Sequence, residues 1–127
     1  MPIIPTLRCS ALDKALPFYT GVLDFTLAER WPKRGDPGFA VLMREGAEVH
    51  LSSHGGDGVF GQAVAVIIPD ADALFVKFRQ RGLDTSKKPQ SPVHQNPTDQ
   101  SWGTREFYAD DPDGNTIRFI QRQGVKS

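Results

Sequence analysis

Few side chains in this sequence are of a type that could do acid–base or metal chemistry. The imidazole of His50, together with the carboxylates of Glu48 and Glu106, could hold a divalent metal or move a proton. The one thiol, Cys9, stands in an apolar segment with no base nearby in the sequence, which argues against a nucleophilic cysteine. A single histidine on a strand is more often a hydrogen-bonded wall residue than a catalyst. We therefore expect His50 to line a pocket.

Aromatic side chains indicate a binding site more strongly. Four of them fall in expected loops or at strand ends, away from the helical stripes where core aromatics belong: Trp31, Phe39, Phe60 and Trp102. Flat apolar walls of this kind suit a flat ligand. Because an exposed indole beside a proline-rich loop is costly without a contact to make, Trp102 is the first candidate for a residue that lines a ligand site.

Composition and charge exclude several classes of protein. The chain has 127 residues, enough for one domain with a core of its own. Fifteen Lys and Arg balance fifteen Asp and Glu, so no nucleic acid and no membrane surface is expected as a partner. A single cysteine indicates a reducing, cytoplasmic location. The longest apolar run covers only 63–68, so we expect neither a membrane span nor a signal peptide.

Two segments carry the apolar periodicity of helices that would position these residues. The first is predicted over 11–22, with Ser10 and Asp13 as its start signal and Pro17 as a local conflict. The second is predicted over 70–81 and opens at Asp70. Seven short runs are typical of strands: Ile3–Cys9, Thr26–Trp31, Gly38–Met43, Ala47–Ser52, Ala63–Ile68, Arg105–Ala109 and Thr116–Gln121.

The two halves of the chain look like copies of one unit. Glycine-led strand patterns at 46–51 and 114–119 lie 68 positions apart, which makes His50 and Arg118 equivalent positions. We predict an α+β fold of two βαβββ modules, about 1–54 and about 62–123, joined by a linker at about 53–61. The modules would form a curved, mostly antiparallel eight-stranded sheet, with helices outside and a concave face free for a ligand.

A segment near the C-terminus carries the most specific pattern. Its centre, Asp111-Pro-Asp-Gly-Asn115, has the residues of a tight hairpin turn. With the preceding Trp-Gly-Thr-Arg-Glu-Phe at 102–107 and the helical segment at 10–25, it resembles the glyoxalase/bleomycin-resistance superfamily, also called the vicinal oxygen chelate proteins. The resemblance covers nearly the whole chain and is greatest to the bleomycin-resistance branch.

The resemblance implies a homodimer that sequesters a bleomycin-type glycopeptide drug in an aromatic groove at the dimer interface, by binding without turnover. It places Trp102 at the position that stacks on the drug's planar bithiazole, with Phe39 at a second groove position. The other residues expected to line the groove are Trp31, His50, Arg118, Glu106 and Phe60. Resistance proteins of this family tend to be acidic, which suits a cationic drug, whereas this chain is neutral.

Enzymes of the superfamily hold a divalent metal at four positions, two in each half. The resemblance maps these to Ile4, His50, Ala63 (or Gln62) and Arg118, of which only His50 is of a ligand type. A guanidinium would repel the cation. We therefore expect no metal, no cofactor and no catalysis.

Two alternative functions stay open at this point. His50 with Glu48 or Glu106 could rebuild a metal site for a lyase or dioxygenase of the glyoxalase type. The same aromatic groove could instead bind a planar aromatic metabolite, since one fold hosts many functions.

Overall fold

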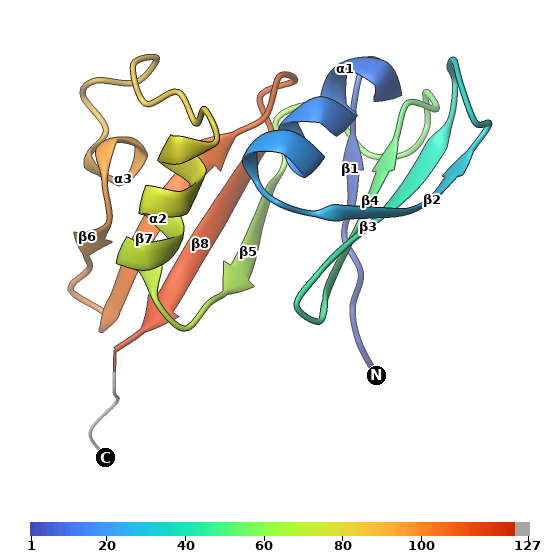
Figure 1. Cartoon of the computed structure of the whole chain (residues 1–127). Coiled ribbons are helices and arrows are strands. Elements are labelled where there is room, and N and C mark those ends of the chain that lie inside the picture. The colour runs from blue at the N-terminus through green and yellow to red at the C-terminus, as the bar shows by residue number, and fades with distance from the viewer. Residues whose placement is uncertain (124–127) are drawn as a thin grey trace. The chain divides into compact units, whose positions relative to one another are not determined.

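The computed structural model describes residues 1–123, and its elements follow the order predicted from the sequence (Figure 1). The first half contains β1 (Thr6–Arg8), α1 (Leu12–Pro17), the π-helix η1 (Phe18–Val22), β2 (Thr26–Trp31), β3 (Phe39–Arg44) and β4 (Ala47–Ser52). The second half contains β5 (Ala63–Ile67), α2 (Ala71–Gln80), α3 (Pro92–Gln95), β6 (Thr98–Asp99), β7 (Thr104–Asp110) and β8 (Thr116–Arg122). Among the described residues, no helix has the length and apolar character needed to cross a bilayer.

The strands form two four-stranded sheets with equivalent topology. Their orders are β1-β4-β3-β2 and β5-β8-β7-β6, so each half repeats the same arrangement. The predicted α+β class and the two βαβββ modules are confirmed, with the eight strands hydrogen-bonded as two sheets. The chain packs as two compact units. Unit 1 comprises Met1–Ala63 with Asp110–Thr116, and unit 2 comprises Val64–Ala109 with the chain from Ile117 on.

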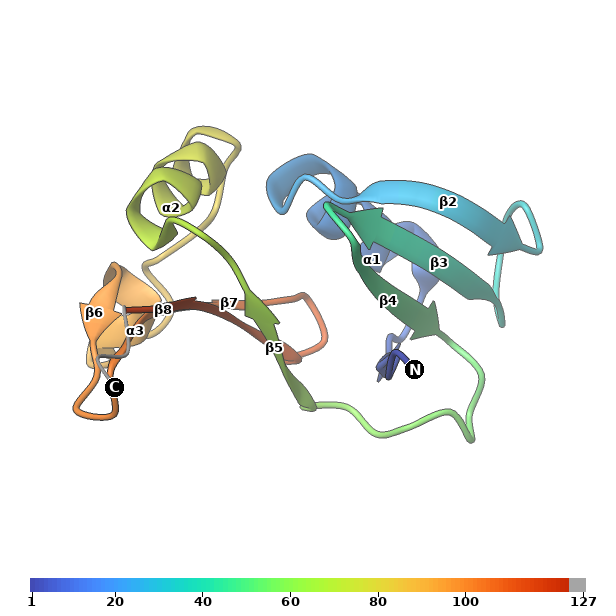
Figure 2. The same cartoon turned by 90° about the horizontal axis from the view of Figure 1, so that it is seen from below.

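In unit 1, α1 and η1 cover one face of the sheet (Figure 2). Successive strand residues point to opposite faces, so alternate side chains enter the core beneath the helices. The buried strand residues are Leu7, Ala40, Leu42, Val49 and Leu51, and the helices add Leu12, Ala15 and Tyr19. The strand residues that alternate with these buried ones point to the opposite face of the sheet, which α1 and η1 do not cover.

The start of the first helix differs from the prediction. Its N-cap is Ala11, whose side chain makes no capping hydrogen bond. The backbone N–H of Leu12 donates instead to Oδ1 of Asp36, 2.9 Å away in the loop before β3. A carboxylate distant in the sequence thus caps the helix in place of the predicted Ser10. Patterns of neighbouring residues do not reveal such a distant cap.

Pro17 divides the predicted helix into two parts. The α-helical hydrogen bonds end there, and in the next turn the N–H of Leu23 donates to the carbonyl of Phe18 at 3.1 Å, five residues back. Proline has no N–H for the four-residue hydrogen bond, so the coil widens to a π-turn at this point. The predicted conflict therefore changes the helix type and leaves the element in place.

In unit 2, α2 covers the sheet through an aromatic core (Figure 1). The side chain of Asp70 accepts from the N–H of Ala73 at 3.1 Å and caps the helix as predicted. Gly82, with a φ of +105°, follows the last turn. The core rings are those of Phe75, Phe78, Phe107 and Phe119, with neighbouring centroids 5.0 to 5.9 Å apart.

Two short elements in the proline-rich segment 85–101 are not among the predicted ones. The α3 helix is a single turn that begins at Pro92, and β6 has two residues that pair with Glu106 and Arg105 of β7. Both are too short to show a period in the sequence.

The Asp-Pro-Asp-Gly-Asn motif forms the predicted hairpin turn between β7 and β8, and its side chains hold unit 1 together. Asp111 is 6% exposed and accepts from the Tyr19 hydroxyl at 2.6 Å and from the Asn115 side chain at 2.9 Å. The Asn115 amide also donates to the carbonyl of Arg8 at 2.8 Å. The positive φ of +82° at Gly114 lets the turn close. This motif serves folding.

Candidate functional site

The strand register shows which side chains share the uncovered face of the unit 1 sheet. Arg8 pairs with Ser52, Ser52 with Phe39, and Phe39 with Trp31, so these four form one row across the sheet. The adjacent row contains Thr6, His50, Val41 and Glu29. Laterally paired residues point to the same face of a sheet. These two rows, with Glu48 beside them, are called the open face of unit 1 below.

Three predicted site residues touch one another on the open face of unit 1. The rings of Trp31 and Phe39 are stacked, with centroids 6.1 Å apart and planes at 24°. Phe39 meets the imidazole of His50 edge to face at 4.9 Å. The imidazole Nε2 lies 2.6 Å from a carboxylate oxygen of Glu48. The result is a continuous aromatic surface that ends in a hydrogen-bonding pair.

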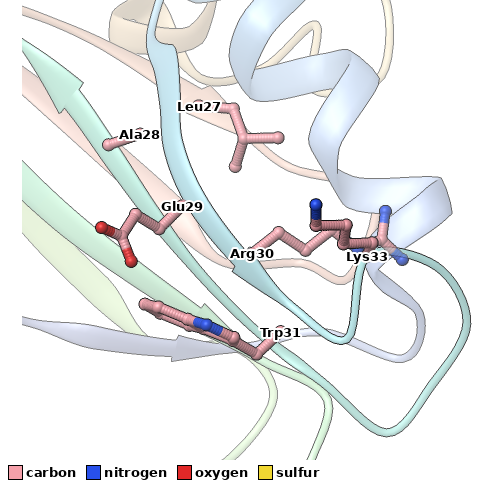
Figure 3. A pocket seen from close by; sticks show the side chains of 6 residues that line it. All are labelled: Leu27, Ala28, Glu29, Arg30, Trp31 and Lys33. Carbon is pink, nitrogen blue, oxygen red and sulfur yellow. The ribbon is translucent and has the colours of Figure 1, made fainter.

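The edge strand of this sheet borders a shallow depression of about 570 Å³ (Figure 3). It is lined by residues of β2 and the loop after it: Leu27, Ala28, Glu29, Arg30, Trp31 and Lys33. Leu27 and Arg30 lie on the α1 side of the strand, while Glu29 and Trp31 lie on the other side (Figure 3). Trp31 is 54% exposed, so one face of its indole is available to a ligand.

Phe60 belongs to a second contact on unit 1, with a residue that the sequence interpretation missed. The guanidinium of Arg8 lies over the Phe60 ring, 4.6 Å from its centroid. Nε of Arg8 is buried and has no hydrogen-bond partner. The alternation of polar Thr6 and Arg8 around the buried Leu7 could have placed Arg8 on the open face.

In unit 2, Trp102 is held by a buried carboxylate. Its indole N–H donates to Oε2 of Glu106 at 3.1 Å, and the Thr104 hydroxyl donates to the same oxygen at 2.5 Å. The Tyr108 hydroxyl donates to the other oxygen at 3.0 Å. Glu106 is 3% exposed, whereas Trp102 is 67% exposed. Glu106 was expected to bind ligand groups, but it is buried and its oxygens already accept from these three donors.

Arg118 lies on the same side of β8 and β7 as this network. Its guanidinium is 5.1 Å from the centroid of the Tyr108 ring, which is also met by the edge of His94 at 5.6 Å. Burial raises the pKa of Tyr108, and the hydrogen bond to Glu106 and the negative charge of that carboxylate raise it further. Trp102, Glu106, Tyr108 and Arg118 are called the open-face network of unit 2 below. Tyr108 was missed in the sequence, although its even spacing from Glu106 predicts a shared face.

The side chains do not fit a catalytic metal site of the kind that superfamily enzymes use. Among residues 1–123, no three His, Cys, Asp or Glu side chains gather where they could hold an ion. His50 has one carboxylate beside it, Glu48, and the donor set at the four mapped positions contains a single imidazole. Arg105, the residue before Glu106 in the chain, pairs with Asp72 at 2.9 Å and with Asp99 at 3.0 Å.

Known proteins share the sequence pattern and the fold. Residues 4–119 match the model of the Glyoxalase/Bleomycin resistance protein/Dioxygenase superfamily. A bleomycin resistance protein of Geobacillus stearothermophilus is 29% identical over 130 residues, which cover 94% of this chain and 95% of that protein.

Two solved structures have the same fold. One is a bleomycin resistance determinant encoded on the transposon Tn5, with a TM-score of 0.75 and 20% identity over 98% of this chain and 99% of that one. The other is a bleomycin-binding protein complexed with bleomycin, with a TM-score of 0.76 and 22% identity over 97% of this chain and 99% of that one. With the family model matching nearly the whole chain, this protein belongs to the Glyoxalase/Bleomycin resistance protein/Dioxygenase superfamily.

Proposed function

We propose that this protein binds a bleomycin-type glycopeptide drug and sequesters it without making or breaking a bond. The curated relatives are bleomycin resistance proteins, and one structure of the same fold is a complex with bleomycin. The ligand's planar aromatic part would stack on the exposed tryptophans. His50 and Arg118 would supply hydrogen bonds to its polar groups.

The observation that carries this proposal is an indole that is exposed and yet held in place. Trp102 is 67% exposed, and its N–H is tied to the buried Glu106. An anchored ring loses little conformational freedom when a flat ligand stacks on it, so more of the stacking energy appears as affinity. Trp31, stacked on Phe39, offers a second such surface in unit 1. Both tryptophans would be costly to leave in water without a contact to make.

The binding unit is proposed to be a homodimer with its aromatic groove at the interface, as the family resemblance implies. The exposed apolar surface of this chain, which includes both tryptophans, supports an interface with a second copy. Light scattering during size-exclusion chromatography measures the mass directly. A mass of about 28 kDa, twice that of the 14.0 kDa chain, is the expected result, and a monomer at micromolar concentration would contradict this part of the proposal.

Calorimetric titration of chelator-treated protein with metal-free bleomycin tests the function. We expect saturable binding near one drug per chain, weakened by about 1–3 kcal/mol in Trp102→Ala. Trp102→Phe should retain part of the affinity, because a smaller ring still stacks. Val76→Ala, on the exposed side of α2, is the matched control and should bind like the wild type.

The outcomes separate the alternatives. Unchanged affinity in Trp102→Ala would remove the stacking role. No binding heat and no thermal stabilisation by bleomycin would overturn the drug proposal and favour a metabolite ligand. Retention of stoichiometric divalent metal after purification, with loss in His50→Ala, would favour the lyase or dioxygenase alternative, in which His50 and Glu48 hold the ion.

A further inference from the structure

Strand β2 does not alternate regularly, and the irregularity places a carboxylate on the open face of unit 1. The pairing of β2 with β3 shifts by one residue between Leu27 and Glu29, with Ala28 as the extra residue. In a regular strand the side chains of Leu27, Glu29 and Trp31 would all point to one face. Here Leu27 lies on the α1 side, whereas Glu29 and Trp31 lie on the other side (Figure 3). The bulge therefore turns a carboxylate and an indole together onto the open face.

The carboxylate of Glu29 is exposed and has no partner among residues 1–123, where it takes part in no hydrogen bond or ion pair. Two other carboxylates that touch the open face are engaged. Glu48 lies 2.6 Å from the imidazole of His50. Asp57 accepts from the hydroxyl of Ser52 at 2.7 Å. Glu29 is thus able to accept hydrogen bonds from a ligand without breaking a bond of the protein.

Trp31 stands next to Glu29 on the same face. Residues two apart in a strand are about 6.6 Å apart along the chain, which is close to the reach of an aromatic ring with a short charged arm. Trp31 is 54% exposed, and its ring is stacked on Phe39. The face of an indole attracts cations, and a neighbouring carboxylate adds to this attraction. An aromatic group that carries a positive charge can therefore contact both side chains at once.

The basic side chains around this pair lie on the other side of β2 or on a distant strand. Arg30 and Lys33 extend to the α1 side, where Arg30 is bound to Asp13 at 2.7 Å (Figure 3). Arg8 is on the open face but belongs to β1, three strands from Trp31, which is about 14 Å at the backbone. That separation exceeds the screening length of about 8 Å in physiological salt. Although the chain as a whole is neutral, the open face around Trp31 is acidic.

We propose that the ligand carries a positively charged group, an ammonium or an amidinium, beside its planar aromatic part, and that Glu29 and Trp31 of unit 1 bind that group. This inference rests on the proposed function, which it deepens by naming the residue that recognises the charge of a cationic drug. A carboxylate accepts charge-assisted hydrogen bonds from either group, and these are about twice as strong as bonds between neutral groups.

Three flat probes that share one indole ring test the charge: tryptamine carries an ammonium, tryptophol a hydroxyl and indole-3-acetate a carboxylate. Binding at unit 1 is followed through the indole N–H signal of Trp31 in two-dimensional NMR spectra of the labelled protein. The variants Trp31→Phe and Trp102→Phe assign the two indole signals. We expect tryptamine to bind about three- to tenfold tighter than tryptophol, and indole-3-acetate to bind most weakly.

Variants of Glu29 separate its charge from its shape. Glu29→Gln keeps the shape, so tryptamine should bind about three- to tenfold more weakly and tryptophol should change by less than about twofold. Glu29→Asp keeps the charge on a shorter arm and should give an intermediate affinity for tryptamine. The matched control is Glu45→Gln, which removes the same charge from the exposed turn after β3 and should change neither affinity. Urea unfolding curves confirm that each variant is folded.

Failure of this inference and failure of the proposed function give different results. Equal affinities of tryptamine and tryptophol at Trp31, an unchanged tryptamine affinity in Glu29→Gln, or no shift of the Trp31 signal with any probe overturns the inference. A tryptamine preference that disappears in Glu29→Gln, in a protein that gives no heat with bleomycin, supports the cation site and overturns the drug. Saturable binding of bleomycin with equal affinity in the wild type and in Glu29→Gln supports the proposed function and overturns the role of Glu29.

Discussion

The cores of units 1 and 2 are built on the same order of strands but are held by different chemistry. In unit 1 the buried Tyr19 donates its hydroxyl to Asp111, and the thiol of Cys9 is 1% exposed. In unit 2 the corresponding space is filled by phenylalanine rings. One core contains titratable groups and the other contains hydrocarbon, so the two should respond differently to substitution and to pH.

The open faces differ in the same way. Trp31 in unit 1 is oriented by ring stacking on Phe39, whereas Trp102 in unit 2 is oriented by a hydrogen bond to the buried Glu106. Trp31 is the last residue of β2 and Trp102 lies in the turn between β6 and β7, and the local side chains decide how each is held. A stacked ring can slide over its neighbour, while a hydrogen bond fixes the direction of the indole N–H.

The largest effect is expected in the hydrocarbon core. Phe107→Ala should lower the free energy of unfolding by about 3–5 kcal/mol, since Phe107 is fully buried among three other rings. Urea unfolding followed by circular dichroism measures the loss. Val76→Ala on the exposed side of α2 serves as the control and should cost less than about 0.5 kcal/mol. A loss below about 1 kcal/mol in Phe107→Ala would contradict a packed aromatic core.

The polar core of unit 1 should be somewhat less costly to break. Asp111→Ala removes the acceptor for the Tyr19 hydroxyl and for two N–H groups of Asn115, for an expected loss of about 2–4 kcal/mol. Tyr19→Phe removes one of these bonds and should cost about 1–2 kcal/mol. The double variant should show a coupling above about 0.5 kcal/mol. Additive losses would mean that the two side chains do not share a hydrogen bond in solution.

Alkaline pH should distinguish the two cores. Burial raises the pKa of Cys9 to about 12, and burial followed by the charge of Asp111 raises the pKa of Tyr19 well above its ordinary value of 10. Both groups lose their protons at a higher pH in the folded protein than in the unfolded chain. The folded state therefore keeps its full stability below the unfolded-state pKa and loses stability as the pH rises from about 9 toward 12. At pH 10.5 the Cys9 contribution to this loss is about 2 kcal/mol.

Urea unfolding at pH 8 and pH 10.5 checks this expectation. The Cys9→Ala, Tyr19→Phe variant is the control, because its stability should fall less over that interval than that of the wild type. An equal loss of unfolding free energy in the wild type and in this variant would show that Cys9 and Tyr19 do not cause the loss of stability at alkaline pH.

The smallest effect concerns the anchoring of Trp102. Glu106→Gln keeps the shape of the side chain but replaces one acceptor oxygen with a donor, for an expected loss of about 1 kcal/mol. In a Trp31→Phe background only Trp102 emits, and its fluorescence anisotropy should fall in Glu106→Gln. The matched test in unit 1 is Phe39→Leu in a Trp102→Phe background, which should free Trp31. Unchanged anisotropy in Glu106→Gln would show that the hydrogen bond does not orient the ring.

Much of the fold was accessible from the sequence because its signals are local. β2 and β4 match the predicted ranges, and α2 lies within its predicted range with its Asp70 cap. Strand alternation and helix periodicity report which face of an element is buried, whatever it packs against. The first helix begins at Leu12, within one residue of its predicted start, but the predicted Ser10 cap was wrong, because the carboxylate that caps this helix, Asp36, is distant in the sequence.

The candidate site was accessible only in part. Residue type and position selected Trp31, Phe39 and His50, and the structure brings these three into contact. The partners of Glu106 and the stacking of Arg8 on Phe60 depend on strand pairing and loop paths that no spacing encodes. Glu106 illustrates the difference, since a carboxylate that follows an arginine in the sequence is buried and accepts from the neutral donors of Trp102, Thr104 and Tyr108.

The sequence by itself determined the repeat of two βαβββ modules, the turn at Asp111–Asn115 and the set of aromatics available for a flat ligand, because these follow from periodicity and residue type. Only the tertiary structure decided which aromatics meet, which carboxylate is buried and which guanidiniums lie over aromatic rings. The physical reason is that burial and hydrogen-bond partners are properties of neighbours in space, and for Arg8 and Asn115 those neighbours are more than fifty residues away in the chain.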